Sequence, residues 1–179
     1  MYRLNLQTFA VEEAKPVEGK KLVYLYRAIG EASKEAGTVM AFTTDNTKTK
    51  SKDADTTITK DGAIRTPSAT EIEISATSLL AKGDKMLARL EKAMDDNEII
   101  EIWEANLEDP GSGGGDKFNE TYYQGYLTEF EISSNAEDYV EISTTFAING
   151  TGATGEVTVS ATQQAIADYA FKDTAKTGV

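Results

Sequence analysis

The sequence predicts a mainly β fold, in which two packed antiparallel sheets form a sandwich or partial barrel and one helix flanks them. Six or seven segments have the two-residue period or the composition of strands, whereas a helical period is clear in only one place. Several of these strands are separated by short turns, which join antiparallel neighbours. The length of 179 residues suits a single domain, 1–179.

The first 77 residues should contain an arm and three strands. Residues 1–19 have no sustained period and form the expected N-terminal arm. Residues 20–29 (KKLVYLYRAI) are apolar on both faces, so this strand should be covered on both sides. Residues 38–44 (TVMAFTT) predict a second strand. Residues 70–77 (TEIEISAT) alternate isoleucine with glutamate, which is typical of a strand with one buried and one exposed face.

One amphipathic helix is expected over residues 85–96. Its helical spacing is carried by Met86, Leu87, Leu90, Ala93 and Met94. Asp84 is a suitable N-cap, and the apolar stripe should face the core. Further along, Ser160 and Gln163 have the spacing of a capping box, which predicts a short helix near 161–169.

The remaining expected strands lie in the C-terminal half, at residues 98–106, 121–133, 138–149 and 156–160. A glycine-rich loop at 109–115 follows the first of them. The second and third are long and separated by a short turn, as in a hairpin. Residues 172–179 are expected to form a loose tail.

The composition argues against an enzyme. The chain has no cysteine, which excludes disulfides and thiolate metal sites, and no histidine, the commonest general base and metal ligand. The net charge of −12 does not suit a protein that holds nucleic acid. Neither a long apolar run nor a secretory signal is present, so we expect no membrane span and folding in a cytoplasm. No catalytic residue, metal or cofactor is therefore predicted.

Several motifs match known sites only superficially. Residues 150–155 (GTGATG) fit the glycine pattern of dinucleotide sites, but a strand pattern follows where a helix is needed. Residues 53–55 resemble the start of a calcium loop whose later positions do not fit. An alternative function is a carbohydrate-binding sandwich displayed on a virion or cell surface. Its candidate aromatic residues, which core or subunit contacts explain more simply, are Trp103, Tyr122, Tyr123, Tyr126 and Tyr139.

The most unusual segment is residues 45–69, a long polar stretch between two strands. Asp61-Gly62 between two isoleucines predicts a tight hairpin within it. Polar excursions of this length are usually functional, and this one suits docking on another copy of the chain. The charged residues expected to take part are Lys48, Lys50, Lys52, Asp53, Asp55, Lys60, Asp61 and Arg65.

A family resemblance agrees with this interpretation. The matching blocks lie in the same order along the chain, at residues 23–27, 41–44, 51–55, 59–62, 65–67, 82–84, 100–104, 122–126 and 134–138. Together they resemble the major tail tube proteins of long-tailed, non-contractile phages, of the type found in phages of Gram-positive hosts. The resemblance runs from about residue 12 to 173 and rests on the combination of blocks rather than on any one of them.

The resemblance implies a tail-tube fold and a structural role in the virion tail. Subunits of that family form hexameric rings that stack into a hollow tube through which DNA is ejected. The implied partners are the chain itself, a tape-measure protein inside the tube and terminal tail proteins at its ends. Assembly would take place in the host cytoplasm, with no membrane involved. Residues 45–69 would be the inter-ring stacking loop.

By the same resemblance, the strands at 38–44, 70–77, 121–133 and 138–149 would form the lumen sheet. The residues whose side chains should pack inward are Met40, Phe42, Ile72, Ile74, Phe130, Ile132, Val140, Ile142 and Phe146. Alternation then points the opposite face into the lumen, with Val39, Ala41, Thr43, Glu71, Glu73, Glu129, Glu131 and Glu141. Because this face carries carboxylates and no cation, phage DNA should pass along it without being bound.

Overall fold

The computed structural model describes residues 15–168, so most of the expected N-terminal arm and the tail at 172–179 lie outside the described residues. The nine strands are β1 (Leu22–Ala28), β2 (Thr43–Ser51), β3 (Ala54–Thr59), β4 (Gly62–Pro67), β5 (Glu71–Leu79), β6 (Ile100–Pro110), β7 (Lys117–Ser133), β8 (Glu141–Ile148) and β9 (Ala153–Thr158). The helices are α1 (Lys85–Asp95) and α2 (Ala161–Asp168), with single 3-10 turns at Gly19–Lys21 and Ile29–Glu31. The mainly β fold class with a flanking helix is confirmed.

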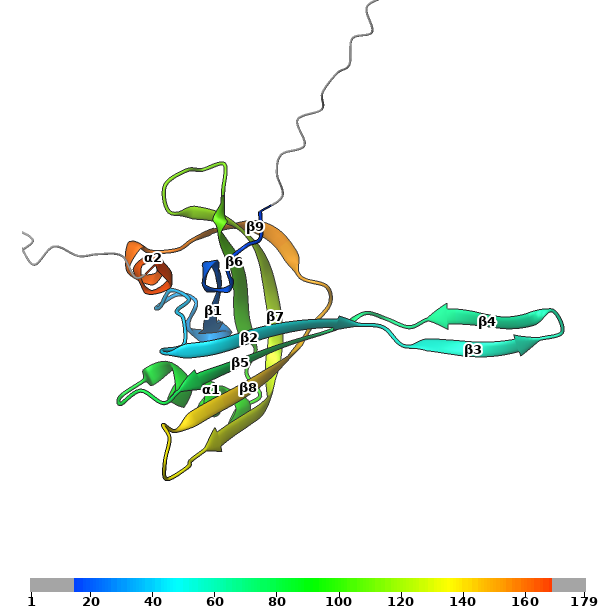
Figure 1. Cartoon of the computed structure of the whole chain (residues 1–179), viewed down its shortest axis with the longest axis horizontal. Coiled ribbons are helices and arrows are strands. Elements are labelled where there is room, and N and C mark those ends of the chain that lie inside the picture. The colour runs from blue at the N-terminus through cyan, green and yellow to red at the C-terminus, as the bar shows by residue number, and fades with distance from the viewer. Residues whose placement is uncertain (1–14, 169–179) are drawn as a thin grey trace, which may run out of the picture.

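Seven strands form one antiparallel sheet in the order β1-β6-β7-β8-β5-β2, with β9 pairing beside the first part of β7. This sheet curls back on itself, so its two halves form the two packed layers, and β3 and β4 form a separate two-stranded sheet (Figure 1). The 17-residue β7 belongs to both halves, because it pairs first with β6 and then with β8. The rings of Tyr26 and Phe146 stack across the interior with centroids 5.3 Å apart.

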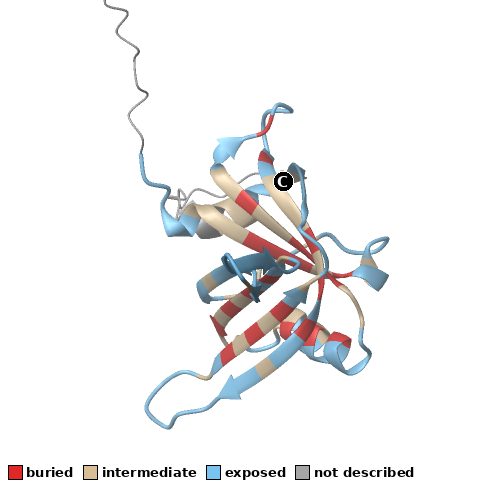
Figure 2. Ribbon diagram, turned by 90° about the vertical axis from the view of Figure 1, so that its right-hand side faces the viewer, coloured by how far each residue is buried: buried red, intermediate tan, exposed pale blue. Residues whose placement is uncertain are grey.

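The main core fills the inside of the curl, and α1 closes one side of it. Buried residues alternate with exposed ones along the strands that line this core (Figure 2). On α1, Leu87, Leu90 and Ala93 are buried, while Asp84 caps the helix by accepting a hydrogen bond from the Met86 amide at 2.8 Å. The predicted helix, its cap and its core-facing stripe are therefore confirmed, except that Met94 at the end of the stripe is 37% exposed.

A smaller second core lies on the other face of the sheet. It joins Leu25, Ala105, Phe118 and Val159. Because Tyr24 and Tyr26 belong to the main core, β1 is buried on both faces, as its sequence predicted. The capping box at the start of α2 is also confirmed, since the Gln163 side chain accepts a hydrogen bond from the Ser160 amide at 2.9 Å.

The predicted strand at 38–44 is wrong. Thr38 makes only an isolated bridge to Tyr26, residues 41–42 form a turn, and β2 begins at Thr43. Phe42 adopts a positive φ of 51° in this turn, a conformation that a bulky L-residue rarely adopts. The apolar composition misled the prediction because Val39 and Met40 are covered by different cores rather than by neighbouring strands.

The predicted loop at 45–69 is also largely strand. Residues 45–51 continue β2 alongside β5, and the rest forms the β3–β4 hairpin, which projects far from the body (Figure 1). The predicted tight hairpin is confirmed, but its two turn residues are Lys60 and Asp61 rather than Asp61 and Gly62, since Thr59 pairs with Gly62. Gly62 has a φ of 132°, which strongly favours glycine at this position.

Candidate assembly surfaces

The β3–β4 hairpin, residues 54–67, is a surface with no side of its own buried in the body. Its base is fastened by the Ser68 amide, which donates to the Asp53 carbonyl at 2.8 Å, and by the Ser68 hydroxyl, which accepts from the Asp53 amide at 3.1 Å. Every residue of the hairpin except Thr59 is exposed. A two-stranded ribbon of this kind gains little from burial, so its length points to contacts outside the subunit.

The structure brings most of the predicted stacking-loop charges together on or beside this hairpin. Lys50 lies on β2, Lys52 and Asp53 lie at the hairpin base, Asp55 and Arg65 lie on its strands, and Lys60 and Asp61 form its turn. All seven are exposed.

Lys48 differs from the other predicted charges because it is bound within the subunit. Its ammonium donates to the Glu104 carboxylate on β6 at 2.7 Å and lies 3.4 Å from the Tyr123 hydroxyl. Burial acts to lower the pKa of Lys48, but the hydrogen bond and charge of Glu104 outweigh it and hold the pKa above its ordinary value. Lys48 therefore links β2 to β6 across the open side of the curled sheet. It does not belong with the other seven predicted charges, which are exposed on or beside the hairpin.

A second surface is the face of β7, β8, β5 and β2 that points away from the main core. These four strands are neighbours, as the lumen-sheet prediction required, with β2 replacing the predicted strand at 38–44. The register places Glu73 beside Ala147 and Thr49, and Glu129 beside Thr145. The five predicted lumen carboxylates lie on this one face and are all exposed: Glu71, Glu73, Glu129, Glu131 and Glu141.

No lysine or arginine side chain belongs to this acidic face in the four strands as described. Lys48 and Lys50 pair with Ile74 and Ile72, so they share the opposite face. Asp45 pairs with Thr77 and adds a sixth carboxylate that the sequence reasoning missed, because it assigned residue 45 to a loop. The acidic face otherwise carries mostly hydroxyl side chains, one of which, Thr145, donates to Glu129 at 3.3 Å.

The predicted inward-facing residues are confirmed except at two positions. Met40, Ile72, Ile74, Ile142 and Phe146 are buried, and Phe130 and Val140 are partly buried. Phe42 and Ile132 are exposed instead, because Phe42 lies in the turn before β2 and Ile132 lies near the end of β7, beyond the core. The prediction that Val39 faces the lumen is also wrong, since Val39 packs against the second core.

The aromatic residues considered for carbohydrate binding do not gather on one surface, although the rings of Trp103 and Tyr122 lie with their centroids 5.5 Å apart. Tyr123 is buried in the main core. Trp103 lies under the Arg27 guanidinium at 4.9 Å, and the Tyr122 hydroxyl donates to Glu101 at 2.8 Å, the same carboxylate that binds Arg27. Tyr126 and Tyr139 are exposed, but Tyr126 lies beside the end of β8 and Tyr139 precedes its start, about 26 Å along the strand.

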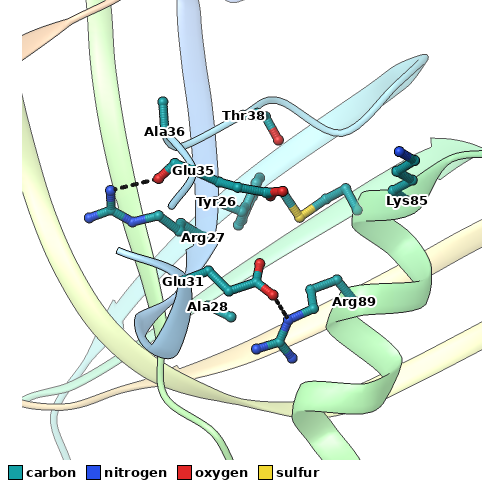
Figure 3. A pocket seen from close by; sticks show the side chains of 10 residues that line it. Tyr26, Arg27, Ala28, Glu31, Glu35, Ala36, Thr38, Lys85 and Arg89 are labelled. Atoms are coloured by element: carbon teal, nitrogen blue, oxygen red, sulfur yellow. Dashed lines mark hydrogen bonds and ion pairs between the residues drawn. The ribbon is translucent and has the colours of Figure 1, made fainter. Parts of the chain in front are cut away.

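A cavity of about 350 Å³ lies between β1 and α1 (Figure 3). Two of its cations are already paired, since Arg89 donates to Glu31 at 2.8 Å and also to Glu98, and Arg27 donates to the Glu35 carbonyl at 3.1 Å. Among the described residues, no cluster of three or more potential metal ligands is present, and no helix has the length and hydropathy to span a membrane. The described residues that line the cavity include charged side chains from several elements, but none of them is a nucleophile paired with a general base.

Glu120 is a titratable residue that the sequence reasoning did not single out. It lies on β7 opposite Ala105 and Gly155, on the same side as the second core. Burial raises the pKa of Glu120 to about 7, and its Oε2 atom has no hydrogen-bond partner. Apart from the alternation of β7, no pattern in the sequence predicts that Glu120 lies among apolar strand residues.

Comparisons with known proteins agree on one family. A family model described as phage tail tube protein matches residues 16–154. A putative tail protein of Staphylococcus phage phiMR25 is 32% identical over 158 residues, which cover 86% of this chain and 81% of that protein. The tail tube protein gp17.1* of Bacillus phage SPP1 is 25% identical over 142 residues, which cover 79% of this chain and 53%, or about half, of that protein.

Solved structures show the same fold. The SPP1 tail tube, determined by solid-state NMR and cryo-EM, matches with a TM-score of 0.68 at 19% identity over 92% of this chain and 95% of that one. The tail of an empty GTA particle, refined with C6 symmetry, matches with a TM-score of 0.60 at 13% identity over 78% of this chain and 99% of that one.

Proposed function

Because the chain belongs to the phage tail tube protein family, which consists of structural proteins of the virion tail and not of enzymes, we propose that it self-assembles into stacked rings that form a hollow tail tube. The observation that carries the proposal is the acidic face of four neighbouring strands, which has six carboxylates and no cation among its described residues. The carboxylates of this face are exposed and do not pack against the cores of the described subunit.

The acidic face would form the wall of the tube. The ends of the curled sheet, β1 and β2, have ladder partners on one side only, apart from the isolated bridge between Tyr26 of β1 and Thr38. Ring closure would cover such edges. DNA is a dense polyanion whose binding depends on lysine and arginine contacts to phosphates. A wall of Glu71, Glu73, Glu129, Glu131 and Glu141, joined by Asp45, offers no such contacts and would let the genome slide during ejection.

The β3–β4 hairpin would connect one ring to the next. It leaves the body along the direction of β2 and β5 and projects well past the sheet (Figure 1). A ring of six subunits is the proposed stoichiometry, supported by the C6 symmetry of the GTA tail that shares this fold. A tape-measure protein inside the growing tube and terminal tail proteins at its ends are the further proposed partners, with assembly in the host cytoplasm.

Electron microscopy tests this proposal directly. The purified chain, concentrated or co-expressed with the other tail proteins of the same virus, should form hollow tubes with a regular axial repeat in negative stain. A sample that remains monomeric by mass photometry under both conditions would refute self-assembly. Binding of the monomer to a glycan array would instead support the carbohydrate-binding alternative.

A further inference from the structure

The two faces of the β3–β4 hairpin differ in chemistry. Ile58 pairs with Ala63, and Thr56 pairs with Arg65, so these four side chains share one face. The other face carries Asp55, Thr57, Ile64 and Thr66. We call the first of these, defined by Ile58, Ala63 and Arg65, the docking face.

Ile58 is the most conspicuous residue of the docking face. It is 86% exposed, although its neighbours in β3 are threonines at positions 56, 57 and 59. Threonine is as suited to a strand as isoleucine, so strand propensity does not explain an isoleucine one residue from the turn. With Ala63 opposite it and Ile64 also 57% exposed on the other face, Ile58 belongs to an apolar tip that projects from the body, where only a partner could cover it.

A matching apolar surface lies at the other end of the body. Phe42, Leu80 and Tyr139 are 68%, 48% and 82% exposed. Their strand ends are neighbours, because the Leu79 amide donates to the Phe42 carbonyl at 3.2 Å and the Leu80 amide donates to the Val140 carbonyl at 2.9 Å. We call these three residues the rim patch.

Phe42 adds a second sign of function to the rim patch. Its positive φ of 51° is disfavoured for a bulky side chain, and the residue is exposed as well. Neither feature benefits the isolated subunit. Backbone strain of this kind is concentrated at functional positions.

The hairpin of one subunit cannot reach its own rim patch. The hairpin continues from Ser51 and returns at Glu71, whereas Phe42 and Leu80 lie at the opposite ends of β2 and β5. These nine-residue strands separate the two surfaces by about 30 Å, and the hairpin points away from the rim patch (Figure 1). Contact between the two surfaces would therefore join different copies, head to tail, which builds an open stack.

The charges of the two surfaces are complementary. Arg65 lies on the docking face, while Asp55 lies on the other side of the hairpin. The turn between β7 and β8, next to the rim patch, carries Glu137 and Asp138 and no cation. Opposite charges around an apolar contact favour one orientation of the partner.

On the premise of the proposed tube, we propose that the docking face of each hairpin seats on the rim patch of a second copy in the adjacent ring. Ile58 packs against Phe42, Leu80 and Tyr139, and Arg65 pairs with Glu137 or Asp138. The inter-ring contact is thus centred on apolar side chains, with the charges of the hairpin setting orientation.

Engineered disulfides test the contact, because the natural chain has no cysteine. The double variant Ile58→Cys with Leu80→Cys should form a ladder of covalently linked subunits when tubes are oxidised. The matched control is Ile64→Cys with Leu80→Cys, whose first cysteine lies on the opposite hairpin face, and it should cross-link at least fivefold less. Equal cross-linking of both variants, or none in Ile58→Cys with Leu80→Cys, would overturn the proposal.

Two single variants give an independent readout. Ile58→Asp and Phe42→Asn should keep the circular dichroism spectrum and Tm of the wild-type monomer, since both side chains are exposed and asparagine tolerates a positive φ. Both should abolish tubes under conditions in which the wild type forms them. Normal tubes from both would refute the docking site while leaving the tube function intact, and would assign the exposed residues to a terminal protein instead. A wild type that never forms tubes would refute the tube itself.

Discussion

If the acidic face is the wall of the tube, as proposed above, reversing its charge should turn a surface that does not hold DNA into one that does. The substitutions Glu129→Lys, Glu131→Lys and Glu141→Lys each replace one negative charge by one positive charge, so together they change each subunit by +6. All three side chains are exposed on the face away from the core. We therefore expect the triple variant to fold and to assemble into tubes of normal length.

The size of the effect follows from counterion release. If one of the three lysines in each subunit of a hexameric ring neutralises a phosphate, each ring makes about six phosphate contacts, and retention should weaken about a thousandfold between roughly 50 and 200 mM salt. Ejection from variant virions should consequently be slow at low salt and approach the wild-type rate at high salt. The wild-type rate should depend much less on salt.

The assay is the rate of DNA release from virions carrying variant tails, measured with a fluorescent DNA dye across a salt series. The control is Glu91→Lys with Asp95→Lys and Glu108→Lys, which makes the same charge change at exposed positions outside the acidic face. This control should eject at the wild-type rate at every salt concentration. A triple variant that ejects normally at low salt, or that forms no tubes, would place these carboxylates on the outside of the tube or at subunit contacts.

Three further predictions concern the subunit itself. Lys48→Met should lower the free energy of unfolding, measured in urea, by about 1–3 kcal/mol, because it leaves the mostly buried Glu104 carboxylate without its cation. The control Lys50→Met should change this free energy by less than about 0.5 kcal/mol, since Lys50 is exposed. Equal effects of the two substitutions would contradict the role of Lys48. Because the folded pKa of Glu120 is raised from 4.5 to about 7, its stabilising contribution is complete below pH 4.5 and is lost as the pH rises through 7. The Tm advantage of Glu120→Gln over the wild type should therefore grow between pH 4.5 and 7 and stay constant above, and a difference independent of pH would rule this out. Replacing residues 54–67 by a short Gly/Ser link should leave the monomer Tm within about 2 °C of the wild type, since the hairpin does not pack on the body of the subunit. The same replacement should prevent tube formation. Normal tubes from this variant would show that the hairpin is not needed for stacking.

The parts of the fold that the sequence predicted are those in which burial imposes a period. β5 alternates Ile72 and Ile74 with glutamates because one of its faces packs on the core and the other faces outward. The stripe of α1 was predictable for the same reason, and so was the acidic face, which is the exposed complement of the buried one.

The parts that were missed are strands whose pairing is not accompanied by burial. β2 is at the end of the sheet, and its inner positions include Lys48 and Lys50, so its sequence has no hydrophobic period. The β3–β4 hairpin buries neither face, and only its turn has a local signal. The rim patch could not be predicted, for the opposite reason. Phe42 is a large apolar residue of the kind usually found in a core, and only the turn at residues 41–42 places it on the surface.

The direct continuation of β2 and β5 into the hairpin also determines how the subunit would respond to a mechanical load. A pull on the hairpin tip acts along the two strands, so it stresses the hydrogen bonds between β2 and β5, and between β5 and β8, in shear and all together. Shear requires many bonds to fail at once, whereas peeling breaks them one at a time. Tension between neighbouring subunits would therefore enter the sheet along its strongest direction, and from β8 it would pass into β7, which spans both layers.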